Sequence, residues 1–324
     1  MSIDISTQFL PYTAITASRP AVLDFVSGAP EWDRLVAQAS FPHLPQSFAY
    51  GEGKRAKGWT VRRAVFSRNN RIEAFATVME RRLAGLRLLT RVNRGPVFLE
   101  ARPQAESIVA VYRTLRRHWR GPLLIAPALE LSADNGALLR AAGFRLRHGE
   151  GWLSGRIDLR RTEQDLWAGL SSSFRNRVRN SVKAGALLRL ASDTDTYEWM
   201  LARHAENMRD KGFTAADATL LRALREAAPQ NVSVFQLLHA GAAVAGMSVV
   251  RFGDSAEYHI GWFGPEGRRL NAGNFLMWEI IKELRRQGVT QFDVGGMRPG
   301  DGYTQFKRTM RPVEFRLAGE WMSF

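Results

Sequence analysis

Residues 291–310 read QFDVGGMRPGDGYTQFKRTM. A strand predicted over 291–294 ends in Gly295-Gly296, and a short glycine-rich loop leads to a helix predicted over 303–310. Proteins with alternating strands and helices build their sites at such strand ends, where glycine lets a ligand approach the backbone closely. Lys307 on this helix could hold a phosphate or stabilise a developing oxyanion. The alternative is a capping turn followed by a surface lysine.

The segment before this stretch predicts a β-meander followed by a long helix. Strands are expected at 232–238, 243–252 and 256–263, and apolar residues at helical spacing indicate a helix over 271–287, which Gly288 ends. A last strand is expected at 313–321. This order is typical of an α+β fold with a mixed, mostly antiparallel sheet flanked by helices.

The first half of the chain repeats this pattern about 170 residues earlier. Strands at 59–66, 71–80 and 86–98 precede a helix at 104–119, and Gly95-Pro96 stands where Gly264-Pro265 stands in the later copy. We interpret the repeat as a duplicated domain, giving two tandem lobes with a cleft between them; two unrelated β-meanders are the alternative. The predicted lobes are residues 1–154, to which a strand within 311–324 returns, and residues 155–310.

The charge of the chain is strongly positive. Its 324 residues include 46 Lys and Arg against 31 Asp and Glu, a net formal charge of +15. Such an excess favours polyanionic partners such as RNA, DNA, nucleotide pyrophosphates or an anionic membrane face. The alternative is a genome that favours arginine codons and a surface that is merely soluble.

The composition also excludes several classes of site. With no cysteine, the chain has no disulfides, thiolate nucleophiles or cysteine-based zinc sites. Its six histidines form no HExxH or HxH pair, so we expect no metal site. Residues 1–10 lack the pattern of a signal peptide, and no apolar stretch approaches the roughly 20 residues that span a bilayer. We therefore expect a cytoplasmic protein, with transient contact to a membrane surface left open.

Residues 171–183, SSSFRNRVRNSVK, predict a basic helix with serine at its N-cap. Phe174, Val178 and Val182 recur every four residues as its predicted buried stripe. Neighbouring cations repel one another on a helix, so their repetition favours contact with tRNA or phosphate. The predicted cationic residues are Arg175, Arg177, Arg179 and Lys183. A solvated basic face is the alternative.

Two shorter motifs complete the pattern. Gln46-Ser47, Tyr50, Lys54 and Gly58-Trp59 indicate a short helix that docks on the first sheet. Arg209-Asp210-Lys211-Gly212-Phe213 ends a helix, where cations could simply complement the helix dipole.

These segments, in this order, resemble the FemABX family of aminoacyl-tRNA-dependent peptidyl transferases and the related FemAB-like N-acyltransferases. The resemblance covers roughly residues 44 to 310, and its most specific element is Asp293–Gly296 with Gly302–Lys307. Tyr50 replaces the family's usual Trp, and the helical arm of some members is absent. The resemblance implies two GNAT-like lobes, the second of which carries the catalytic motif.

The resemblance also assigns site residues. It places Lys307 in the active cleft, makes Lys54 a ligand of the substrate pyrophosphate, and offers Lys211 or its rival Arg209 as a second phosphate contact. Tyr303, in the same element as Lys307, is expected to bind substrate. The general base stays open between Asp293, His259 and the donor's own hydroxyl.

We therefore expect a monomeric acyltransferase without a bound cofactor that takes an aminoacyl group from aminoacyl-tRNA. Its acceptor would be an amine that carries a pyrophosphate, such as a peptidoglycan precursor. An acyl-CoA-dependent N-acyltransferase on the same fold is the first alternative; it is the less favoured one, because Arg269–Asn274 matches the GNAT pyrophosphate turn only in a degraded form. A non-enzymatic RNA- or DNA-binding protein is the second.

Overall fold

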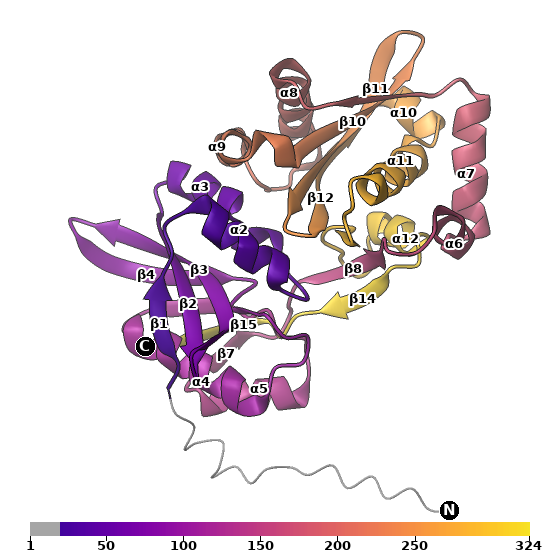
Figure 1. Ribbon diagram of the computed structural model, residues 1–324. Helices are drawn as coiled ribbons and strands as arrows, with labels where there is room; N and C mark the ends of the chain where they lie inside the picture. Colours follow the sequence, from indigo (N-terminus) through magenta and orange to yellow (C-terminus); the bar gives the residue numbers. More distant parts are fainter. Residues whose placement is uncertain (1–19) are drawn as a thin grey trace, which may run out of the picture.

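The computed structural model describes residues 20–324, which form two lobes, each built on one β-sheet (Figure 1). The segment 1–10, from which no signal peptide is expected, lies outside the described residues. Within residues 20–324, no helix has the length and apolar character needed to cross a bilayer.

The first sheet has the strand order β1-β2-β3-β4-β6-β15-β7, and β5 pairs with β3. Its strands are β1 (Val22–Phe25), β2 (Thr60–Arg68), β3 (Arg71–Leu83), β4 (Leu86–Asn93), β5 (Val97–Phe98), β6 (Leu123–Ala126), β7 (Arg145–His148) and β15 (Glu320–Ser323). The helices of this lobe are α2 (Ala29–Gln38), α3 (Phe48–Ala56), α4 (Ala105–His118) and α5 (Ala133–Ala141).

The second sheet has the order β9-β10-β11-β12-β13-β8-β14. Its strands are β8 (Leu153–Asp158), β9 (Leu187–Ala191), β10 (Val232–His239), β11 (Ala242–Phe252), β12 (Ser255–Phe263), β13 (Gln291–Asp293) and β14 (Val313–Arg316). The helices of this lobe are α6 (Glu163–Gly169), α7 (Ser172–Lys183), α8 (Thr194–Lys211), α9 (Ala218–Ala227), α10 (Pro265–Arg269), α11 (Ala272–Arg286) and α12 (Gly302–Arg308).

The two sheets have the same topology with one strand exchanged. In each, four antiparallel strands are followed by a parallel neighbour and then by two antiparallel strands. β15 fills the sixth position of the first sheet, and β8, which directly follows β7, fills that position in the second. The repeat seen in the sequence is thus a repeat of topology, and the predicted α+β architecture of two tandem lobes is confirmed.

The end of the chain differs from the prediction. The single strand expected over 313–321 is two strands, and only β15 joins the first sheet. β14 pairs with β8 in the second sheet, so the prediction that 311–324 returns to the first lobe is wrong for its first part. The chain passes from one sheet to the other within 317–319, where Gly319 has φ 89°.

Apolar packing joins the two lobes. One cluster of buried residues combines Trp32 and Val65 of the first lobe with Met200, Leu221 and Val250 of the second. Trp32 is completely buried, and its indole N–H donates to the carbonyl of Gln46 at 2.8 Å. Burial of this kind stabilises a fold by about 25 cal/mol for each Å² of apolar surface removed from water. The lobes are therefore held together by a shared core.

Candidate active site

The candidate site begins where β12 and β13 separate. These parallel strands pair only over Ser255–Glu257 and Gln291–Asp293, after which β13 ends and β12 continues. β12 also contains a bulge, because Tyr258 pairs with Val249 and Ile260 with Ser248, which leaves His259 without a partner in β11. Bulges redirect side chains and are frequent beside active sites.

Lys307 lies buried beside this separation. Its side chain is only 1% exposed, its Nζ donates to the carbonyl of Gly296 at 2.7 Å, and the rings of Tyr258 and Tyr303 lie 5.3 and 4.7 Å from the ammonium. The two phenol groups are joined by a hydrogen bond of 2.5 Å. Burial lowers the pKa of Lys307 to about 8, against the opposing effect of nearby carboxylates. The group is therefore mainly a cation at neutral pH.

Asp293 holds the turn that Lys307 contacts. Its buried carboxylate accepts the backbone N–H of Gly295 at 2.8 Å and a hydrogen bond from the hydroxyl of Ser154. Burial, and then the negative charge of Glu257, raises the pKa of Asp293 to about 6. The carboxylate that was predicted as a general base is thus already engaged by a backbone N–H and a hydroxyl group.

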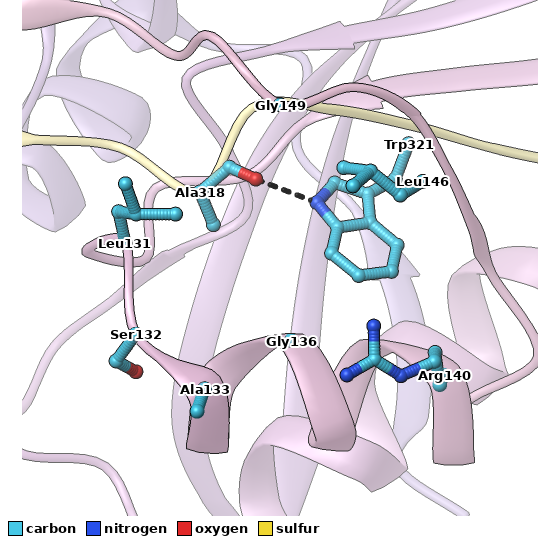
Figure 2. Close-up of a pocket in the computed structure, with 9 residues that line it drawn as sticks. All are labelled: Leu131, Ser132, Ala133, Gly136, Arg140, Leu146, Gly149, Ala318 and Trp321. Carbon is cyan, nitrogen blue, oxygen red and sulfur yellow. Dashed lines mark hydrogen bonds between the residues drawn. The ribbon is translucent and has the colours of Figure 1, made fainter.

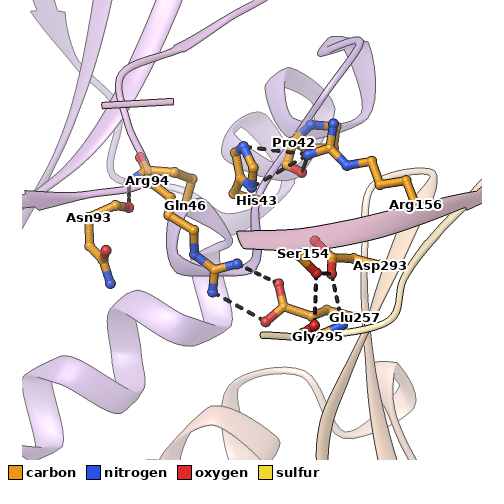
Figure 3. Close-up of polar contacts among 10 residues, drawn as sticks. All are labelled: Pro42, His43, Gln46, Asn93, Arg94, Ser154, Arg156, Glu257, Asp293 and Gly295. Atoms are coloured by element: carbon orange, nitrogen blue, oxygen red, sulfur yellow. Dashed lines mark hydrogen bonds and ion pairs between the residues drawn. The ribbon is translucent and has the colours of Figure 1, made fainter. Parts of the chain in front are cut away.

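A buried ion pair connects the lobes next to Asp293. The guanidinium of Arg94, after β4, donates to both carboxylate oxygens of Glu257 in β12 at 2.8 and 3.2 Å, as Figure 3 shows. Arg94 also lies 4.2 Å from the ring of Trp152. A bidentate pair of this kind gives a fixed geometry.

A second arginine lies beside this pair. The guanidinium of Arg156 contacts the ring nitrogens of His43 at 3.4 and 3.5 Å and the carbonyl of Pro42 (Figure 3). Burial, with Arg156 and then Arg94, lowers the pKa of His43 well below its usual range, so this ring is neutral. The sequence analysis missed these residues, although a charged Glu257 in an otherwise apolar strand is a usable signal.

His259 is the least buried of the three predicted catalytic residues. Lys307 and Asp293 are buried, whereas the bulged His259 keeps part of its surface exposed. Burial, and then the positive charges of His204 and Arg94, lowers its pKa to about 4. The imidazole is therefore neutral at pH 7 and can accept a proton.

The match to a known domain covers this part of the chain. Residues 171–308 match the family model described as an acetyltransferase (GNAT) domain. Most of the second lobe is therefore similar to a GNAT domain. The match confirms the predicted acyltransferase class and includes all three predicted catalytic residues. None of the curated proteins matches the sequence significantly.

Solved structures extend the fold to the whole chain. FemX superposes with a TM-score of 0.77 at 16% identity, covering 93% of this chain and 96% of that one. A tandem GNAT protein from the clavulanic acid biosynthesis pathway gives 0.52 at 16% identity, covering 93% and 98%. A conserved protein of unknown function from Bacteroides thetaiotaomicron gives 0.62 at 11% identity, covering 93% and 99%. The chain has the two-lobed fold that the FemABX resemblance implied.

The predicted phosphate contacts lie near the boundary between the lobes. Lys54, on α3, is half-buried with its ammonium 5.3 Å from the ring of Tyr50. Arg209 and Lys211 are exposed in the last turn of α8. The six residues that follow α8, which span at most about 20 Å, lead to Asp217, and Asp217 pairs at 2.5 Å with Lys57 just beyond α3. One short connection therefore links the two predicted phosphate-binding regions.

The cations predicted to form one basic stripe on α7 of the second lobe have different surroundings. Arg175 turns back and donates to the carbonyls of Ala168 and Leu170 at the end of α6, while Arg179 lies 5.5 Å from the ring of Trp167. Arg177 and Lys183 are exposed. Arg175 thus has a structural role, and the cations free to meet a phosphate are fewer than predicted.

The buried stripe of α7 needs one correction. Ser171 caps the helix as predicted, accepting the N–H of Phe174, and both Phe174 and Val178 are buried. Val182, however, is 58% exposed, so its predicted burial is wrong. The buried residue of this last turn is Ser181, whose hydroxyl donates to the carbonyl of Leu270 at 2.5 Å.

A hollow in the first lobe is separate from these groups (Figure 2). Its volume is about 310 Å³, and its walls are mainly apolar side chains such as Leu131, Leu146 and Trp321, with Arg140 as its charged member. It contains no pair of groups suited to proton transfer, so we do not assign it to acyl transfer. Among residues 20–324, no cluster of three His, Asp or Glu side chains is arranged to hold a metal ion.

Proposed function

We propose that this protein is an aminoacyltransferase that moves an amino acid from aminoacyl-tRNA to an amine acceptor such as a peptidoglycan precursor. The observation that carries the proposal is the buried ammonium of Lys307, which lies beside the β12–β13 separation of a GNAT domain and within the motif that resembles FemABX enzymes. The fold of FemX supports the same assignment. We propose that the reaction takes place in the cytoplasm. The enzyme would act as a monomer without a bound cofactor.

The chemistry is an acyl transfer. The acceptor amine attacks the ester carbonyl of the donor, a C–N bond forms, and the tetrahedral intermediate carries a negative oxygen. The C–O bond to the ribose then breaks, and the proton lost by the amine goes to the released ribose oxygen. In this proposal the Lys307 cation stabilises the negative charge, and removing one such contact typically costs about 3–4 kcal/mol in the barrier.

Access to Lys307 requires a local movement. Its ammonium is bonded to Gly296 and lies beside the rings of Tyr258 and Tyr303, so in this proposal the donor reaches it when the loop 297–301, which joins the Gly296 turn to α12, moves. The last four residues of this loop, 298–301, are exposed, and Gly300 has φ 80°. Tyr303 lies in the first turn of α12, just after the loop, which fits its predicted contact with substrate.

His259 is the side chain that we propose as general base. It is neutral at pH 7 and partly exposed, whereas Asp293 is buried and already accepts two hydrogen bonds. Because a base with a pKa of about 4 is weak, the donor's own hydroxyl can share the proton transfer. Asp293 then acts by positioning the turn at Gly295.

The basic residues divide between the two substrates in this proposal. Lys54, with Arg209 or Lys211, binds the pyrophosphate of the acceptor, because Lys54 lies near the Lys57–Asp217 pair that joins the lobes and a short connection leads from the end of α8 to Asp217. Arg177 and Lys183 on α7 meet the tRNA backbone. An assay with labelled aminoacyl-tRNAs would identify the amino acid that is transferred.

An acyl-CoA-dependent transfer is the second candidate, because one observation favours it. The amide Nδ2 of Asn274, in the first turn of α11, is buried and finds no hydrogen-bond partner among residues 20–324. Asn271 precedes this helix with φ 54° and provides no side-chain cap. An unpaired amide donor at the N-terminus of a helix suits a pyrophosphate such as that of CoA.

The decisive experiment compares the two donors. Purified protein would be incubated with UDP-linked muramyl pentapeptide and either radiolabelled aminoacyl-tRNAs or acetyl-CoA, with Lys307→Ala as the control. Label that moves from tRNA in the wild type but not in the variant would establish the proposal. Transfer only from the thioester would establish the CoA alternative, and tRNA binding without any turnover of either donor would favour a nucleic-acid-binding protein.

A further inference from the structure

The hairpin of β3 and β4 ends in exposed leucines. Figure 1 shows the hairpin projecting from the first lobe. Leu83 and Leu86 pair across the strands, and their exposed fractions are 68% and 70%; Leu88 is 52% exposed. The turn between them, Ala84-Gly85, has positive φ at both residues, as in the tight turns that join antiparallel strands. The tip is therefore a defined apolar point held on a regular hairpin.

The base of the hairpin carries a positive charge. Between residues 81 and 91 the chain has four arginines and no acidic residue. The buried carboxylate of Glu80 forms ion pairs, all within 4.0 Å, with the guanidinium groups of Arg62, Arg82 and Arg87. Because one carboxylate cannot neutralise three guanidinium groups, this side of the lobe carries a net positive charge.

We propose that this hairpin docks the protein on the surface of an anionic lipid bilayer. The leucines would enter the boundary between headgroups and acyl chains, and the arginines would lie at the depth of the lipid phosphates. Arg81 lies 4.5 Å from the ring of Trp59, an aromatic residue at the same level as the arginines. A cationic base behind an apolar tip matches the two layers of such a surface.

The observations favour a bilayer over two other partners. An RNA would contact the arginines and leave the exposed leucines in water. A second copy of this chain, with its own charge of +15, would bring two arginine-rich hairpins together at an energetic cost. A bilayer uses both features at once.

Docking at this point would orient the first lobe. Arg81 donates to the carbonyl of Gly58 at 2.9 Å, directly after α3, which carries Lys54. The base of the hairpin and the end of α3 therefore form one unit, and a docked hairpin would hold that end of the lobe near the membrane. This inference does not rest on the proposed function, because it depends only on the surface of the hairpin.

Vesicle sedimentation tests the inference directly. We expect the full-length protein to bind vesicles of 70% phosphatidylcholine and 30% phosphatidylglycerol, and to bind pure phosphatidylcholine much more weakly. The double variant Leu83→Glu/Leu86→Glu should weaken binding to anionic vesicles about tenfold or more. The control is Leu187→Glu, which replaces a leucine of similar exposure, 65%, in the second lobe. Equal binding by both variants, or none by the wild type, would overturn the inference.

A fluorescent probe locates the contact. The chain has no cysteine, so Leu86→Cys creates a single site for an environment-sensitive dye, and Leu187→Cys provides the matched control. We expect a blue shift on anionic vesicles for the dye at position 86 and not at 187. Light scattering that shows a dimer lost in Leu83→Glu/Leu86→Glu would identify a second copy as the occupant and reject the bilayer. Displacement from vesicles by RNA with no shift at position 86 would reject it as well.

Discussion

The Nζ of Lys307 lies 2.7 Å from the carbonyl oxygen of Gly296, so α12 is bonded to the turn that ends β13. Asp293 holds the same turn from the other side through the N–H of Gly295. A buried cation and a buried carboxylate thus share one glycine pair. The backbone of this turn is therefore fixed by groups whose charge state depends on pH.

Replacing Lys307 should remove activity without removing the fold. Lys307→Ala is expected to lower kcat/KM about 10²–10³-fold, because a cation near the developing charge is lost. Circular dichroism and sedimentation would establish that the variant stays folded. Lys307→Arg is the matched control, since it keeps the charge but not the shape. Wild-type activity in Lys307→Ala would remove this residue from the mechanism.

The activity should fall on the alkaline side of pH 8. The pKa of Lys307 is about 8, below its usual range, so the cation is lost as pH rises through that value. If the cation is the active form, kcat/KM declines above about pH 8, and Lys307→Arg moves this decline to higher pH. A rate that instead increases above pH 8 would mean that the neutral amine acts as a base.

The fold could be predicted from the sequence because its signals are local. The strands of both meanders and the helix at 271–287 follow from apolar periodicity and glycine boundaries, and the structure has α11 at Ala272–Arg286. A return of the chain end to the first lobe was expected, as β15 does, but the pairing of β14 with β8 in the second sheet was not visible, since strand pairing between distant segments leaves no mark in the periodicity. Val182 illustrates the same limit, because only the position of neighbouring α11 decides whether the last turn of α7 is covered.

The sequence offered three candidate residues but not their environment. Lys307 and Asp293, which belong to the motif, and His259, which lies outside it, are found around the β12–β13 separation. The motif could not show that Lys307 is enclosed or that Arg94 reaches Glu257 from the other lobe, because both facts depend on the docking of the lobes. Arg175 was assigned to tRNA, yet its carbonyl partners belong to the preceding helix.

The carboxyl of Asp293 should make stability depend on pH. Its pKa of about 6 in the folded state lies above the value of 3.8 expected without burial, so folding favours the protonated form. Its contribution to stability is complete below about pH 4 and is lost as pH rises through 6. Asp293→Asn keeps an oxygen that accepts from Gly295 but does not titrate. In urea unfolding the variant should gain stability relative to the wild type between pH 4 and 7, and a difference that is constant with pH would contradict this assignment.

The ion pair of Arg94 and Glu257 should be costly to break and cheaper to replace. Both side chains are buried, so Arg94→Ala leaves an unpaired carboxylate and is expected to destabilise the fold by about 3–5 kcal/mol. The exposed pair of Asp158 and Arg160 is the control, and Asp158→Ala should cost at most about 1 kcal/mol.

The double variant Arg94→Met/Glu257→Leu shows whether the loss of stability comes from an unpaired charge or from the loss of the contact between the lobes. If the loss in Arg94→Ala comes from the uncompensated carboxylate, replacing both partners by apolar side chains should restore much of the stability, as measured by urea unfolding. The pH profile of its activity is a separate readout: Arg94 lowers the pKa values of both Asp293 and His259, so its removal should raise the pKa of His259 and move the acid limb of the profile to higher pH. A double variant as unstable as Arg94→Ala would show instead that the bidentate geometry itself holds the two lobes together.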